Sequence, residues 1–189
     1  LAANEQAKGK GVMVVFSDGI YGGRDVQKIS TCQTDAFDSK DFGGMGYMVD
    51  GVPYFYNDSV KCHTTETEFD VSSLKELPKV GVAYFTIDAD PEILDYYKES
   101  GVQGIVIAGA GSGCYSEQWN NKIDELAETG IPVVRCSRIG SGVITQDDYF
   151  IGNIARGNDL APQKAATLLR LILTVTNDIE QVQNMFDKY

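Results

Sequence analysis

Residues 104–119 read GIVIAGAGSGCYSEQW, and this stretch decides the fold. Its first part, residues 104–108, is a short apolar run bounded by glycine, which is typical of a strand buried on both faces. Residues 109–115 are rich in glycine and predict a tight loop. Ser116 then predicts the start of a helix, because a serine hydroxyl can accept a backbone N–H of the first turn. The order strand, loop, helix is that of a βαβ unit.

The same alternation continues on both sides of this stretch. Residues 80–85 and 132–136 are two more apolar runs and predict strands. The helices are predicted to begin at the following caps or prolines: Asp90 with Pro91, Ser116, Pro162, and Asn177 paired with Glu180. The first helix should bury Ile93, Leu94 and Tyr97 and end at Gly101. Strands that alternate with helices predict a parallel α/β sheet with right-handed crossovers.

Ligands of such sheets meet the loops that follow the carboxyl ends of the strands. Here those loops are residues 86–90, 109–115 and 137–149. The glycine-rich loop follows G-x-G-x-G and not the dinucleotide pattern G-x-G-x-x-G, so it indicates either an anion-binding turn or a loop shaped by close packing. The third loop carries Asp147 and Asp148, which are either solvated carboxylates or ligands of an α-amino group.

Two further side chains are candidates for chemistry. Cys114 lies near the N-terminus of the helix that Ser116 begins, where the helix dipole favours a thiolate, so it is a candidate nucleophile. The only histidine, His63, lies in a distant polar segment, and a Cys–His pair is therefore not expected. Lys28 follows the Gly22-Gly23 turn and is either an exposed charge or a buried cation that relays a proton.

The first part of the chain is predicted to be rich in strands. Residues 12–16 predict a buried strand. Residues 46–49 and 52–56 predict a hairpin around the turn Asp50-Gly51. Residues 57–78 are polar without periodicity and predict a linker.

The start of the sequence predicts the end of a helix. Residues 1–8 have the character of its last turns, and Gly9 and Gly11 would end it. We therefore expect the parent protein to have an upstream portion, in the same chain or in a separate one.

Composition excludes several classes of function. The 27 acidic and 16 basic residues give a net charge of -11, which argues against a nucleic-acid partner. No run of about 18 apolar residues exists, so no membrane span is predicted. The four cysteines show no CxxC spacing and no clustered histidine, so no zinc site is expected. Their positions leave open whether Cys32 and Cys62 form a disulfide or all four are free thiols.

An ordered series of short motifs runs along the chain. The motifs are Gly22-Gly23-Arg24-Asp25-Val26-Gln27-Lys28, Gly46-Tyr47, His63-Thr64, Phe69-Asp70-Val71-Ser72, Leu77-Pro78-Lys79-Val80-Gly81, Gly104-Ile105-Val106, Arg138 and Pro162-Gln163-Lys164-Ala165. Each motif is short, but the similarity runs in order from about Leu1 to Tyr189 and includes the final Phe186-Asp187-Lys188-Tyr189. The series resembles bacterial L-asparaginases of the periplasmic, high-affinity class (type II).

The resemblance implies a fold and an activity. Residues 79–189 would form a C-terminal flavodoxin-like domain with three layers and a parallel sheet. Residues 58–78 would be a linker, and residues 1–57 a β-rich remnant of the N-terminal α/β domain. The implied reaction converts L-asparagine and water to L-aspartate and ammonia, with L-glutamine as a second substrate in some members, and without metal or organic cofactor. The implied assembly is a homotetramer, a dimer of intimate dimers, located in the periplasm or secreted, with the cytoplasm as the alternative.

The resemblance also carries over site residues. Lys28 falls on the catalytic lysine, which acts with two threonines and an aspartate from motifs upstream of this sequence. Residues 109–115 match the loop that each subunit contributes to its partner's active site, and Cys114 stands where the family usually has Asn or Ser. The family's glutamate for the substrate's amino group follows a stretch like residues 145–147. Here Asp148 stands in its place, with Asp147 as the other candidate, and the loop is shorter.

Two rival interpretations belong to other classes. In the first, the chain is a non-catalytic fragment that retains only dimerisation and substrate-contact surfaces. In the second, it is an independent flavodoxin-like binding module. That module would need a loop rich in Ser and Thr for a flavin phosphate, which residues 109–114 do not provide.

Overall fold

The computed structural model describes residues 1–147, 149–150 and 152–189. The chain divides into two compact units, Leu1–Thr67 and Glu68–Tyr189. The division falls inside the polar segment 57–78, where the 3₁₀ helix η2 (Thr64–Glu66) is the element that the structure describes. None of the described helices is both long and apolar enough to cross a lipid bilayer.

The second unit is built on a parallel sheet. Its strands are β7 (Val80–Tyr84), β8 (Gly104–Gly109), β9 (Val133–Ser137) and β10 (Ile154–Arg156). They lie in the order β10-β9-β8-β7, and each neighbouring pair is parallel. The predicted α/β class with a parallel sheet is therefore confirmed. Strand β10 was not predicted, because three residues are too few to show a period.

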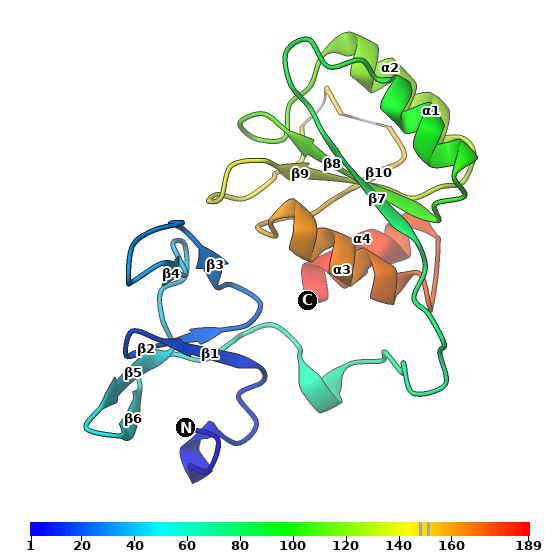
Figure 1. Ribbon diagram of the computed structural model, residues 1–189. Helices are drawn as coiled ribbons and strands as arrows, with labels where there is room; N and C mark the ends of the chain where they lie inside the picture. The colour runs from blue at the N-terminus through cyan, green and yellow to red at the C-terminus, as the bar shows by residue number, and fades with distance from the viewer. Residues whose placement is uncertain (148, 151) are drawn as a thin grey trace. The chain divides into compact units, whose positions relative to one another are not determined.

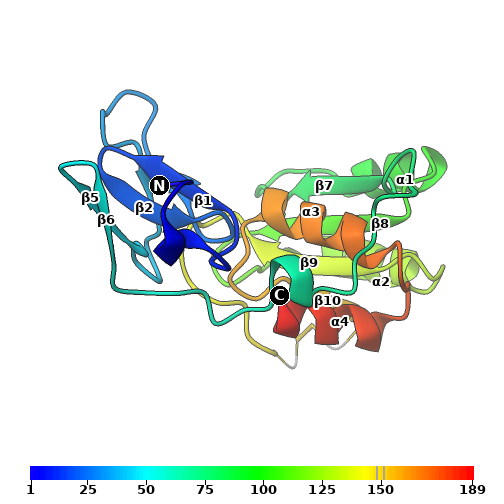
Figure 2. The same ribbon diagram turned by 90° about the horizontal axis from the view of Figure 1, so that it is seen from below.

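Helices cover both faces of this sheet. They are α1 (Glu92–Glu99), α2 (Glu117–Ala127), α3 (Pro162–Ile172) and α4 (Ile179–Lys188). Helices α1 and α2 lie side by side on one face, and α3 and α4 lie on the other, which gives three layers (Figures 1 and 2). Helices α1 and α2 connect β7 to β8 and β8 to β9 in the same direction across the sheet, so right-handed crossovers place both on one face.

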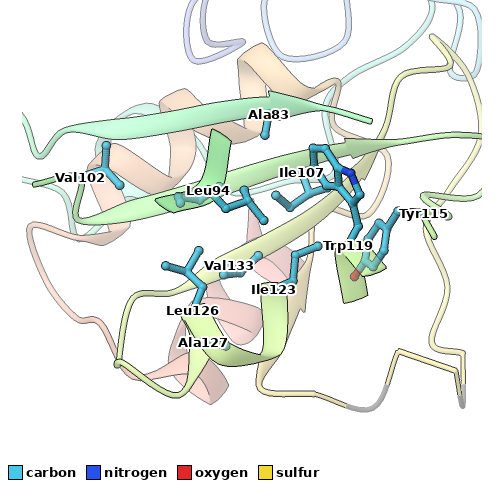
Figure 3. Packing of buried hydrophobic residues seen from close by; sticks show 11 residues of the cluster. Ala83, Leu94, Val102, Ile107, Tyr115, Trp119, Ile123, Leu126, Ala127 and Val133 are labelled. Carbon is cyan, nitrogen blue, oxygen red and sulfur yellow. The ribbon is translucent and has the colours of Figure 1, made fainter. Parts of the chain in front are cut away.

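Strand β8 lies at the centre and divides two cores. All of its side chains are buried, as the apolar run predicts. Ile107 joins the core beneath α1 and α2 together with Trp119, which is 1% exposed (Figure 3). The Trp119 Nε1–H donates to the Ala89 carbonyl at 2.7 Å. Its neighbour Val106 joins the core beneath α3 and α4, together with Phe186. Alternate residues of one strand therefore stabilise opposite layers.

The helix caps agree with the sequence in part. The Ser116 hydroxyl accepts the Trp119 N–H at 3.4 Å, so the predicted cap of α2 is confirmed. The prediction for α4 was wrong by one residue: the cap is Asp178, which accepts the Gln181 N–H at 3.0 Å. In α1 the prediction that Ile93 is buried was also wrong, because Ile93 is 40% exposed while Leu94 is buried.

The first unit contains antiparallel strands. A sheet in the order β1-β2-β5-β6 is formed by β1 (Met13–Phe16), β2 (Gly19–Gly22), β5 (Gly46–Val49) and β6 (Val52–Phe55). A separate pair is formed by β3 (Gln27–Lys28) and β4 (Phe37–Asp38). The predicted hairpin is β5–β6. Its turn residues Asp50 and Gly51 have φ values of 50° and 79°, as a tight type I′ connection requires.

Two predictions for this unit were wrong. The first residues do not form the end of an α-helix but the single 3₁₀ turn η1 (Glu5–Ala7), capped by the Asn4 side chain. Strand β1 is not buried: Val15 is 42% and Phe16 38% exposed, because β1 lies at the edge of its sheet. An apolar run predicts a strand, but the sequence alone does not say what covers it.

Candidate functional site

The glycine-rich loop after β8 is a closed turn. Ala110 and Cys114 exchange both backbone hydrogen bonds, at 2.8 Å and 2.7 Å. Gly111 and Gly113 have φ values of 51° and 82°, which glycine adopts at no steric cost. A Cβ at Gly109 would lie 2.3 Å from the Gly113 carbonyl carbon. The loop therefore needs Gly109 for close backbone approach, and Gly111 and Gly113 for their left-handed backbone conformation.

The loop after β9 is attached to this turn. The Ser137 hydroxyl donates to the Gly111 carbonyl at 2.5 Å. The Arg138 N–H donates to the Gly109 carbonyl at 2.9 Å, and its Nη1 donates to the Phe85 carbonyl at 2.9 Å. Phe85 directly follows β7, so Arg138 connects all three strand-end loops of the sheet. These are the loops at which the sequence predicts a ligand site.

Cys114 lies at the end of this turn with its side chain exposed. The only histidine, His63, belongs to the first unit, where its Nδ1 is 3.0 Å from the Thr64 hydroxyl. Among the described contacts, Cys114 makes no hydrogen bond to a histidine that could activate its thiol as a nucleophile. All four cysteines are free, so the structure contains no Cys32–Cys62 disulfide.

Asp147 lies in the loop after β9 and is exposed. Its Oδ1 accepts the Tyr149 N–H at 2.9 Å, so the carboxylate stabilises its own turn. The same loop is anchored by Ile144, which is 3% exposed and donates its N–H to the Asn158 carbonyl at 2.9 Å. Asp148, the other predicted ligand of an amino group, lies outside the described residues. Cys114 and Asp147 thus belong to adjoining loops of one sheet edge.

Lys28 belongs to the first unit, in the short strand β3. Its side chain is exposed, and its Nζ lies 5.7 Å from the centre of the Phe37 ring. In the described chain Lys28 is thus an exposed charge, and its role in moving a proton stays a prediction. The nearby pair of Arg24 and Asp25, joined at 2.9 Å, stabilises the preceding turn.

Arg135 is a site residue that the sequence interpretation missed. It lies in β9 and is 2% exposed. Its Nη1 donates to the Ser112 carbonyl at 2.9 Å and its Nη2 to the Thr145 carbonyl at 2.7 Å. The signal in the sequence is one arginine inside the apolar run Val133-Val134-Arg135-Cys136, since a charge in a central strand needs specific partners.

No group of three or more His, Cys, Asp or Glu side chains that could hold a metal ion occurs in the described part of the chain. The loops after β8 and β9 offer backbone groups, the Cys114 thiol and the Asp147 carboxylate, together with hydroxyl and amide side chains such as Ser112 and Gln146. Such groups are suited to hold a small polar ligand by hydrogen bonds.

Residues 79–186 match the family model described as the Glutaminase/Asparaginase C-terminal domain. The chain belongs to the asparaginase/glutaminase family. Residues 1–61 also match the model described as Asparaginase, N-terminal. The asparaginase family thus accounts for both units of the chain.

Individual asparaginases are similar along the whole chain. L-asparaginase 2 of Bacillus subtilis is 40% identical, covering 100% of this chain and 50% of the relative. L-asparaginase 2 of Escherichia coli is 39% identical, covering 100% of this chain and 55% of the relative. The crystal structure of a probable cytoplasmic L-asparaginase from Campylobacter jejuni superposes with a TM-score of 0.93 at 40% identity, over 98% of this chain and 60% of that one. The chain spans about half the length of the curated relatives it matches.

Proposed function

We propose that this chain is part of an L-asparagine amidohydrolase, which converts L-asparagine and water to L-aspartate and ammonia. The observation that carries the proposal is the joined pair of loops after β8 and β9, on a chain that belongs to the asparaginase/glutaminase family. L-glutamine is proposed as a second substrate. A relative that is 38% identical, from Acinetobacter glutaminasificans, is named a glutaminase-asparaginase.

The residues divide the work in the following way. Lys28 handles a proton for an upstream threonine that attacks the amide, because a hydroxyl is a weak nucleophile until a basic group assists it. The exposed position of Lys28 in this chain keeps its Nζ accessible to such a partner. Cys114 contacts the substrate from the glycine-rich loop, and Asp147 or Asp148 binds its α-ammonium group. The reaction needs neither a metal nor an organic cofactor.

The proposed assembly is a homo-oligomer, a dimer of intimate dimers in which the loop of residues 109–115 completes the active site of the partner subunit. Cys114 in place of Asn or Ser weakens one contact, since a thiol is a poorer hydrogen-bonding group than an amide. We propose a periplasmic or secreted enzyme of type II. The alternative is a cytoplasmic enzyme, as the Campylobacter jejuni protein is described. The linker is proposed at residues 58–78, between a remnant at 1–57 and a domain at 79–189.

The role of Lys28 is tested in a chimera that joins the upstream half of the Bacillus subtilis enzyme to this chain. Lys28→Gln should lower kcat for ammonia release from L-asparagine by about 10²–10⁴-fold, the usual effect of losing general acid–base assistance. Lys40→Gln is the matched control, because Lys40 is also an exposed lysine of the first unit. If Lys28→Gln retains the kcat of the Lys40→Gln variant, Lys28 is not the proton-handling group.

A further inference from the structure

Arg135 is a buried charge at the centre of the parallel sheet. It and Ser39 are the buried polar or charged side chains among the described residues. Burial lowers the pKa of the Arg135 guanidinium from its usual value, since a cation is less stable away from water. A buried guanidinium is retained only where specific hydrogen bonds compensate for the lost hydration.

The partners of Arg135 are backbone carbonyls, one in each of two loops. Ser112 lies at the tip of the glycine-rich loop, and Thr145 lies in the loop after β9. The two donors belong to one rigid, planar guanidinium, so the two carbonyls are held at a fixed separation. Ser137 and Arg138 donate to the carbonyls of Gly111 and Gly109, where the loops leave the strands. Arg135 instead donates to Ser112 and Thr145, which lie further along each loop.

Aromatic rings and a glycine enclose the guanidinium. Its central carbon lies 4.2 Å from the centre of the Phe150 ring, and this ring contacts Tyr115 edge-on at 4.8 Å. A Cβ at Gly113 would lie 3.1 Å from Arg135 Cγ, so the loop rests directly on the stem of the arginine. Contact with a ring face stabilises a cation and excludes water from its hydrogen bonds.

We propose that Arg135 is a positioning residue that locks the loop of residues 109–115 to the loop of residues 137–147, so that Cys114 and Asp147 are held together for the substrate. The functional half of this inference rests on the proposed asparaginase activity. The structural half, which we call the lock, is the joining of the two loops through the hydrogen bonds of Arg135 to Ser112 and Thr145. It is independent of what the loops bind.

Arg135→Lys removes the planar guanidinium, which holds both carbonyls, but keeps the positive charge. Lysine keeps a long apolar stem and a positive charge, but its ammonium is a point donor and cannot span both carbonyls. The Nε of Arg135 has no hydrogen-bond partner among the described residues, so the substitution removes none there. Arg170→Lys is the matched control. Arg170 is exposed on α3 and donates to the Pro78 carbonyl at 3.1 Å, away from both loops.

Hydrogen exchange of the 189-residue chain tests the lock. Arg135→Lys should accelerate amide exchange at Cys114 and at Ile144 together by about tenfold or more, the effect of losing one hydrogen bond to a charged group. The amides of β8 and all amides of Arg170→Lys should keep their rates. Unchanged exchange in both loops would overturn the proposal, and so would an equal increase throughout β8 and β9, which would mean a purely structural role.

A second variant covers the case in which Arg135→Lys does not fold. Phe150→Leu leaves both hydrogen bonds of the guanidinium in place but removes the ring beside it. It should therefore accelerate amide exchange in the same two loops to a smaller extent. Loops that exchange as in the unsubstituted chain would contradict the lock.

Kinetics of the chimera test the positioning role. Arg135→Lys should raise KM for L-asparagine by about tenfold with kcat changed by only a few-fold, because misplaced loops weaken binding of the ground state and the transition state alike. Faster exchange with an unchanged KM would overturn the positioning role. A chimera without any asparaginase activity would count against the proposed function, and the exchange experiment would still decide the lock.

Discussion

Gly157 and Cys136 show how tightly the core beneath α3 and α4 is packed. A Cβ at Gly157 would lie 2.2 Å from Cys136 Sγ, and both residues are buried. Cys136 is 0% exposed and packs with Val106, Val134 and Phe186 beneath α3 and α4. Because interiors are close-packed, a methyl group at Gly157 must displace the Cys136 sulfur, and we expect the two positions to be coupled.

Gly157→Ala should therefore lower the free energy of unfolding by about 1–3 kcal/mol, as overpacking does. Cys136→Ala removes the sulfur that the new methyl group meets, so the double variant should be more stable than Gly157→Ala alone. Urea unfolding followed by the fluorescence of Trp119, the only tryptophan, measures this for the second unit. Losses that simply add in the double variant would contradict the contact.

At the scale of elements, helix α4 begins one residue later than its sequence predicts. Asn177 and Glu180 have the spacing of a capping pair, but Asp178 accepts the Gln181 N–H at 3.0 Å. The Thr176 hydroxyl accepts the Asp178 N–H at 3.1 Å and so fixes the approach of the chain to the helix. Two adjacent residues with good capping side chains cannot be ranked by propensity alone.

Asp178→Ala should cost about 1 kcal/mol of stability, the usual effect of losing a cap. Asn177→Ala should change stability by less than about 0.5 kcal/mol, as surface substitutions do. Both are measured by the same urea unfolding. An equal or larger loss for Asn177→Ala would mean that the sequence prediction, and not Asp178, identifies the cap.

The sequence predicted the elements whose patterns are long or carry strong signals. Strand β8 is apolar throughout, the β5–β6 hairpin has its Asp50-Gly51 turn, and the Ser116 cap lies before an amphipathic helix. Features that depend on distant contacts were not predictable. The pairing of β10 with β9 and the exposure of β1 are of this kind. So are the partners of Arg135, which lie 23 and 10 residues away in sequence.

At the scale of the whole molecule, burial makes the second unit sensitive to alkali. Burial raises the pKa of the Cys136 thiol from 9.0 to about 12. Burial also raises the pKa of the Tyr115 hydroxyl from 10.0. For each group the folded state keeps a proton that the unfolded state has already lost. The stabilisation is complete below the pKa of the unfolded group and is lost as pH rises towards the pKa of the folded group.

The free energy of unfolding of the second unit should therefore fall above pH about 9, by up to about 1.4 kcal/mol per pH unit from Cys136 alone. Tyr115 adds to the slope above pH about 10. Cys136→Ala removes the first contribution, so its stability should approach that of the unsubstituted chain between pH about 9 and 10. A constant difference between the two proteins over this range would contradict the burial of an un-ionised thiol.

The most direct test of the account is ammonia release from L-asparagine by the 189-residue chain, alone and joined to the upstream half of the Bacillus subtilis enzyme. We predict only background release by the chain alone, because the proposed attacking threonine lies upstream of this chain and Cys114 has no hydrogen bond to a histidine among the described contacts. We predict clear turnover by the chimera. Turnover by the chain alone would show that its own residues perform the chemistry. An inactive, folded chimera would contradict the proposal that this chain contributes to an asparaginase active site.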